Sequence, residues 1–116
     1  MRPDILKESE GKVVDEFKNF LLSHYPNRIE LIELFGSKAR GDSDEDSDVD
    51  LLVVVDKEDR EFDDQICELM SELCLKYNIL ISPVIFEKEE FELYKRVEAS
   101  IILNIEKEGI VLWEMS

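Results

Sequence analysis

Residues 35–55 read FGSKARGDSDEDSDVDLLVVV, and the interpretation of the whole chain depends on this stretch. It begins where the apolar run 29–35 ends, at Gly36 and Ser37, and it closes with the β-branched apolar run 50–55. Both runs have the composition of buried strands. The stretch therefore predicts two strands that are joined through a glycine turn and a polar loop.

The turn at Gly36 and Ser37 has the composition of a phosphate cradle. Glycine allows the backbone to turn tightly, and serine adds a hydroxyl donor beside the backbone amides at the start of a short helix through Lys38 and Arg40. A glycine and a serine after a strand are more often only a turn, so this motif alone does not establish a site.

Two carboxylates, Asp48 and Asp50, stand two residues apart at the start of the second strand. Because alternate side chains of a strand point to the same face, both project to one side of the sheet. Magnesium prefers carboxylate oxygens together with substrate phosphate oxygens, and two such ions assist an in-line displacement at phosphorus. The turn and the acidic pair therefore complement each other: one binds the terminal phosphates of a triphosphate, and the other binds metal.

Outward from this stretch, the periodicity predicts helices and strands in alternation. We expect helices over 4–24, 59–77 and 88–107, strands over 29–35, 50–55, 79–86 and 110–113, and a polar loop over 37–47. This order predicts an α/β (α+β) fold in which helices pack on one small sheet. A length of 116 residues favours a single domain over residues 1–116.

The apolar stripes identify the expected core positions of each helix. The residues expected to face inward are Val13, Phe17, Phe20, Leu21 and His24, then Phe62, Ile66, Leu69, Met70, Leu73, Cys74 and Tyr77, then Phe91, Tyr94, Val97, Ile101 and Ile105. We expect both Cys67 and Cys74 to be core residues, since they lie about 10 Å apart along one helix, too far for a disulfide. With His24 as the only histidine, a bound metal must use oxygen ligands.

The formal net charge of −15 is unevenly distributed. Residues 1–40 carry seven basic and seven acidic residues, whereas residues 41–116 carry seven basic and twenty-two acidic residues. Such a surface repels nucleic acid backbones and favours basic protein partners or bound cations. No apolar stretch is long enough for a membrane span and no signal peptide is evident, so we expect a cytoplasmic protein.

The spacing of Gly36-Ser37, ten intervening residues and Asp48-Val49-Asp50, with strands on both sides, resembles the signature of the minimal nucleotidyltransferases of the DNA polymerase β superfamily. The resemblance covers nearly the whole chain. It implies a polymerase β-like palm, a mixed sheet flanked by helices, and Mg²⁺-dependent transfer of a nucleoside monophosphate from a triphosphate, with ATP expected, to a hydroxyl.

By the same resemblance, Gly36 and Ser37 bind the triphosphate, and Asp48 and Asp50 bind two Mg²⁺ ions and are the catalytic residues. Arg40 matches a basic position of the family that contacts phosphate. An ion pair between Arg40 and the acidic loop is an equal alternative, and Lys38 is a weaker candidate for phosphate binding.

One position departs from the family. A third carboxylate usually stands on the next strand, where it binds metal and accepts the proton of the incoming hydroxyl, but Ser82 occupies that place here. Pro83 has no amide proton and therefore predicts an edge strand or a bulge. Glu87 could substitute for the missing carboxylate, although a role at the start of the following helix is favoured.

Relatives of this length resemble the antitoxins of two-gene modules whose toxin is a helical HEPN protein. This implies adenylylation of a hydroxyl, expected on a tyrosine of a HEPN partner, which silences the toxin. The alternative is a non-catalytic acidic module that masks a basic HEPN surface. A homodimer through the last strand also remains open.

Overall fold

The structure is a computed structural model that describes residues 6–41 and 48–115. Its elements are α1 (Glu8–His24), β1 (Ile29–Phe35), α2 (Gly36–Arg40), β2 (Val49–Val55), α3 (Arg60–Tyr77), β3 (Ile81–Glu87), α4 (Lys88–Arg96), α5 (Ser100–Glu108) and β4 (Ile110–Glu114). The four described strands form one sheet in the order β3-β2-β1-β4, in which β2 and β3 are parallel and the other pairs antiparallel. The predicted mixed sheet with flanking helices is confirmed, and β3, which contains Pro83, lies at an edge as expected.

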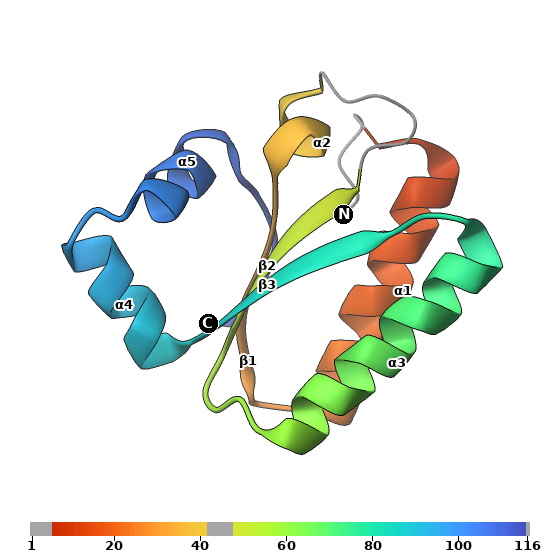
Figure 1. Cartoon of the computed structure of the whole chain (residues 1–116), viewed down its shortest axis with the longest axis horizontal. Helices are drawn as coiled ribbons and strands as arrows, with labels where there is room; N and C mark the ends of the chain where they lie inside the picture. Colours follow the sequence, from red (N-terminus) through yellow and green to blue (C-terminus); the bar gives the residue numbers. More distant parts are fainter. Residues whose placement is uncertain (1–5, 42–47, 116) are drawn as a thin grey trace.

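Helices cover both faces of this sheet. In Figure 1, α1 and α3 lie on one side of the strands and α4 and α5 on the other. The alternation of β2 matches these layers, because Val49, Leu51 and Val53 join the core beneath α1 and α3, whereas Leu52 and Val54 pack with Ile105 of α5. Asp50 alternates with the first set and therefore lies on the α4 and α5 side.

Most predicted boundaries agree with the structure within a few residues. The strand over 29–35 matches β1, and the helix over 59–77 matches α3, whose first turn is capped by the Asp59 carboxylate accepting from the Phe62 amide at 2.8 Å. The first helix begins at Glu8, and residues 1–5 of its predicted range lie outside the described residues, as do residues 42–47 of the polar loop.

The single helix predicted over 88–107 was wrong, because the chain forms two helices there. Glu98 has the left-handed φ of 52°, and the Ala99 amide donates to the Tyr94 carbonyl at 3.0 Å, which closes α4. No glycine or proline marks this break. It turns the chain so that α5 lies beside α2 and leads into β4, which pairs with β1.

The break also changes which apolar side chains face inward. Val97 is 63% exposed, and Tyr94 and Ile101 are exposed too, contrary to the prediction, whereas Ile102 and Ile105 are buried. The predicted stripe assumed one continuous helix, and the turn at residues 97–99 rotates α5 relative to α4.

Three further core predictions, for Cys67, Cys74 and His24, were wrong. Cys67 is exposed and Cys74 is only partly buried, although both are free thiols as expected. Cys67 follows the buried Ile66 and so lies about 100° around the helix from the face that packs. His24 is also exposed and stacks on Phe20 with ring centroids 3.9 Å apart.

The short helix α2 is anchored to α1 by a buried ion pair. Lys38 Nζ contacts Glu10 Oε2, and the two side chains are only 3% and 7% exposed. Burial alone raises the pKa of Glu10, but the hydrogen bond from Lys38, the Lys7 amide and the charge of Lys38 outweigh it and lower that pKa. The pair therefore places α2 firmly against α1.

In the described part of the chain, no helix is both long and apolar enough to span a bilayer.

We predict that Lys38→Met lowers the free energy of unfolding by about 3 kcal/mol at pH 7, because it removes the ion-pair partner of the buried Glu10 carboxylate. Urea denaturation measures this. Because the pKa of Glu10 is lower in the folded state than the unfolded value of 4.5, its charged form stabilises the fold above that value. This stabilisation is lost as the pH falls through the lower folded pKa. The difference in stability between the wild type and Lys38→Met should therefore shrink in acid.

Lys12→Met is the matched control, because Lys12 pairs with Glu8 on the exposed surface of α1, the helix that carries Glu10. It should change stability by less than about 0.5 kcal/mol. Equal effects of the two substitutions would contradict a special role for the buried pair.

Candidate functional site

The antiparallel pairing of β1 and β2 brings the glycine turn and the acidic strand together. Phe35, the last residue of β1, pairs with Asp50. Gly36 follows with a left-handed φ of 75°, and a Cβ atom added there would lie 2.3 Å from Asp50 Oδ2. No other residue type can occupy position 36 without displacing this carboxylate. The glycine turn and the Asp50 carboxylate, which the sequence predicts to form one site, are therefore direct neighbours.

Asp48 and Ser82 complete the same end of the sheet. Ser82 pairs with Asp50 across the parallel strands β2 and β3, and its hydroxyl donates to Asp48 Oδ2 at 2.8 Å. Asp48 is exposed and Asp50 half-buried. The serine thus lies beside both carboxylates, at the position where the sequence comparison with the family expected a third one.

The electrostatics of this end favour a bound cation. Burial raises the pKa of Asp50, the neighbouring Asp48 raises it further, and only the Arg40 charge opposes this. A carboxylate whose charged form is penalised by burial and by a second carboxylate gains most when a cation binds beside it.

The donor set at this end fits magnesium. Asp48 and Asp50 both offer carboxylate oxygens at this end, and among the described residues no group of three or more His, Cys, Asp or Glu side chains could hold a metal ion. Magnesium commonly takes one or two carboxylates and completes its shell with waters and substrate phosphates. Two carboxylate side chains beside a turn whose composition suits phosphate match this pattern.

Arg40 and Lys38, the basic residues of α2, both form ion pairs. Lys38 is buried against Glu10, which accounts for its charge without a phosphate. Arg40 Nη1 donates to both carboxylate oxygens of Glu108 at 3.0 Å. The partner considered from the sequence, the acidic loop over 42–47, lies outside the described residues. Sequence reasoning missed Glu108, because nothing local in the sequence relates residues 68 positions apart.

Glu87 does not replace the third carboxylate. It pairs with Val55 at the opposite end of β2, five residues beyond the Asp50–Ser82 pair, or roughly 16 Å along the strands. Its side chain accepts from the Glu58 amide at 2.8 Å and caps α4. The favoured interpretation of Glu87 as a helix-start residue is therefore confirmed.

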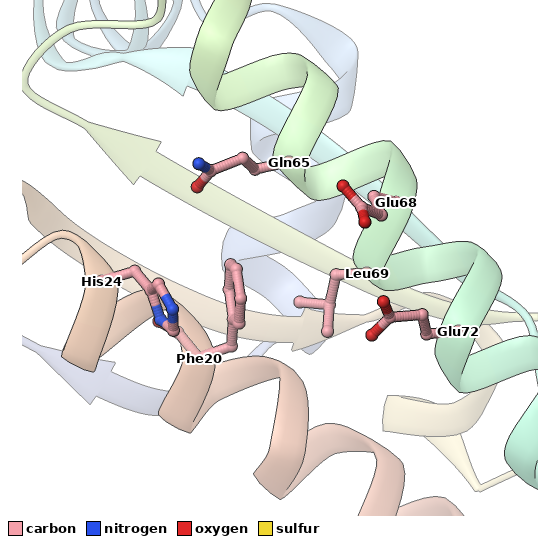
Figure 2. Close-up of a pocket in the computed structure, with 6 residues that line it drawn as sticks. All are labelled: Phe20, His24, Gln65, Glu68, Leu69 and Glu72. Atoms are coloured by element: carbon pink, nitrogen blue, oxygen red, sulfur yellow. The ribbon is translucent and has the colours of Figure 1, made fainter.

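A separate hollow of about 220 Å³ lies between α1 and α3. Figure 2 shows the side chains that line it, from Phe20 and His24 on one helix to Gln65, Glu68, Leu69 and Glu72 on the other. Because α1 and α3 cover the sheet face opposite to Asp50, this hollow is not part of the site at Gly36 and Asp50.

Comparison with known proteins agrees with this geometry. The family described as "Nucleotidyltransferase domain" matches residues 14–112, which include every candidate site residue. Two proteins of Methanocaldococcus jannaschii are similar over most of their length. "Putative protein adenylyltransferase MJ0604" is 40% identical over 90% of this chain and 99% of its own, and "Putative protein adenylyltransferase MJ0141" is 36% identical over 85% and 94%.

Solved structures share the fold at lower identity. A toxin-antitoxin complex with AMP-PNP has a TM-score of 0.57 at 24% identity, covering 88% of this chain and 74% of that chain. A complex of a tri-AMPylated Shewanella oneidensis HEPN toxin with its MNT antitoxin has a TM-score of 0.54 at 20% identity, covering 90% and 71%. These likenesses establish the polymerase β-like fold. Together with the matched family and the two archaeal relatives, they lead to one conclusion: the chain belongs to the nucleotidyltransferase domain family.

Proposed function

We propose that this protein transfers AMP from ATP to a hydroxyl of a partner protein. The observation that carries the proposal is the contact between Gly36 and the Asp50 carboxylate, with Asp48 beside it. It unites a turn suited to phosphates and a pair of carboxylates suited to Mg²⁺ at one end of the sheet. The names of the two archaeal relatives support protein adenylyl transfer as the reaction.

Each site residue has a defined role in this proposal. Gly36 and Ser37 bind the terminal phosphates, Arg40 adds positive charge for them, and Asp48 and Asp50 hold Mg²⁺. When bound, the metal supplies positive charge that stabilises the attacking and leaving oxygens. The acceptor hydroxyl loses its proton to solvent water, its oxygen forms a bond to the α-phosphorus, the bond from that phosphorus to the bridging oxygen breaks, and pyrophosphate leaves.

The proposed acceptor is a tyrosine of a helical HEPN toxin, which the transfer would silence. Support comes from fold relatives that were solved with such toxins, one of them AMPylated. The net charge of −15 also favours a basic partner.

A second candidate function rests on Ser82. A serine hydroxyl is a poor base at neutral pH, and Glu87 lies too far away to accept the proton of the acceptor. A chain with slow or no transfer would then neutralise its partner by masking a basic surface, with nucleotide binding as a remnant.

We predict that ATP binds only in the presence of Mg²⁺ or Mn²⁺, and that Asp48→Asn combined with Asp50→Asn abolishes this binding while the fold remains. The carboxylates repel each other without metal, so their neutralisation should not lower stability. Calorimetry with and without chelator measures binding, and thermal unfolding measures the fold. Asp64→Asn is the control, because Asp64 is an exposed carboxylate on α3, away from the site. Unchanged Mg²⁺-dependent binding by the double variant would remove both aspartates from the site.

We predict that Gly36→Ala weakens Mg²⁺-ATP binding at least tenfold, because a methyl group there meets Asp50 Oδ2 and moves the carboxylate. The positive φ adds a strain of about 1 kcal/mol, so the loss of stability should be modest. Titration calorimetry and urea denaturation separate the two effects. A folded variant that binds like the parent would show that the close approach of Gly36 to Asp50 does not matter for the ligand.

We predict that the wild type transfers labelled AMP to a co-purified HEPN partner and that Ser82→Asp accelerates transfer, by up to about a hundredfold, since it adds a base beside the aspartates. Ser82→Ala is the control for loss of the hydroxyl alone. If neither the wild type nor Ser82→Asp transfers AMP while both still silence the partner, masking replaces the enzyme.

A further inference from the structure

We propose that Glu108, the last residue of α5, is a positioning residue for nucleotide binding that acts through Arg40. This inference rests on the proposed function, because it assigns Glu108 a part in holding the triphosphate. Neither the sequence motif nor the family resemblance assigned Glu108 to the site.

The contact between the two side chains is specific. Arg40 Nη1 lies 3.0 Å from both Oε1 and Oε2 of Glu108, so one guanidinium nitrogen donates to both carboxylate oxygens. Glu108 is 20% exposed and Arg40 is 45% exposed. The more buried carboxylate therefore holds a guanidinium that reaches toward solvent at the end of α2, four residues beyond Gly36.

The fold fixes Glu108 at this place. Leu34 of β1 pairs with Ile110 of β4 in antiparallel register, two residues after α5 ends at Glu108, and α5 packs against α2. The end of α5 is therefore brought to the start of the phosphate turn by the same strand pairing that completes the sheet.

Gly109 makes this arrangement tight. A Cβ atom at residue 109 would lie 1.9 Å from Glu33 Oε2 and 2.5 Å from the Ile105 carbonyl oxygen. The Gly109 amide also donates to the Ile105 carbonyl at 2.7 Å. Glu108 is consequently presented by a closely packed helix end, and the partly negative C-terminus of α5 adds to the attraction for Arg40.

Two physical effects of Glu108 on a bound triphosphate have opposite signs. Arginine has a long, flexible side chain, and ordering it before the ligand arrives reduces the entropy lost on binding. The negative charge of Glu108 instead repels phosphate. We infer that ordering prevails, because both carboxylate oxygens engage the guanidinium and the pair lies at the helix that carries the turn.

The test compares Mg²⁺-ATP affinity by calorimetry in the wild type, Glu108→Ala, Arg40→Ala and the double variant. Loss of ordering should weaken binding about tenfold in Glu108→Ala. If Glu108 acts through Arg40, the double variant should bind like Arg40→Ala alone. A merely structural role would not produce this non-additivity. Glu106→Ala, exposed on the same helix, is the matched control and should bind like the wild type.

Glu108→Gln keeps the size of the side chain and one acceptor oxygen, so it should show an intermediate loss and serves if the alanine variant does not fold. Equal or tighter binding by a folded Glu108 variant, or additive effects of the two alanine substitutions, would overturn the inference while the proposed function stands. A wild type that fails to bind Mg²⁺-ATP would overturn both.

Discussion

The close approach of Gly36 to the Asp50 carboxylate is the constraint on which the rest of the site depends. It follows from the antiparallel pairing of β1 with β2, which sets Phe35 opposite Asp50 and leaves the next residue no room for a side chain. Because the backbone there also has a positive φ, glycine is required for two independent reasons. The turn proposed to bind phosphate and the carboxylate proposed to bind metal are thereby held side by side.

The helix that extends from this turn is held from both faces of the sheet. On one side Lys38 reaches the buried Glu10 of α1, and on the other Arg40 reaches Glu108 of α5. The two pairs differ in energetics. The buried pair is costly to break because a charge would remain without water or partner, whereas the exposed pair contributes little to stability and mainly orders a flexible side chain. The basic residues of α2 thus anchor the turn as well as supplying charge.

Ser82 places a hydroxyl beside the two aspartates, at the position where the family resemblance implies a third carboxylate. Its hydroxyl donates to Asp48 and its backbone pairs with Asp50, so the strand arrangement that would present a third carboxylate is intact. A serine here orients a neighbour but adds neither charge nor a useful base. Under the proposed function, Asp48 and Asp50 hold the metal, and no carboxylate at position 82 accepts the proton of the acceptor.

Local patterns of the sequence determined the strands around Gly36 and Asp50 and the helix α3, and they singled out the candidate site residues, because each depends on side-chain periodicity or on neighbours a few residues apart. The tertiary structure decided what depends on distant partners. The break at Glu98 has no local signal and arises where α5 must turn to lie beside α2 and feed β4. The ion pairs of Lys38 and Arg40, and the exclusion of Glu87, likewise depend on which elements become neighbours, and that is settled only when the sheet assembles.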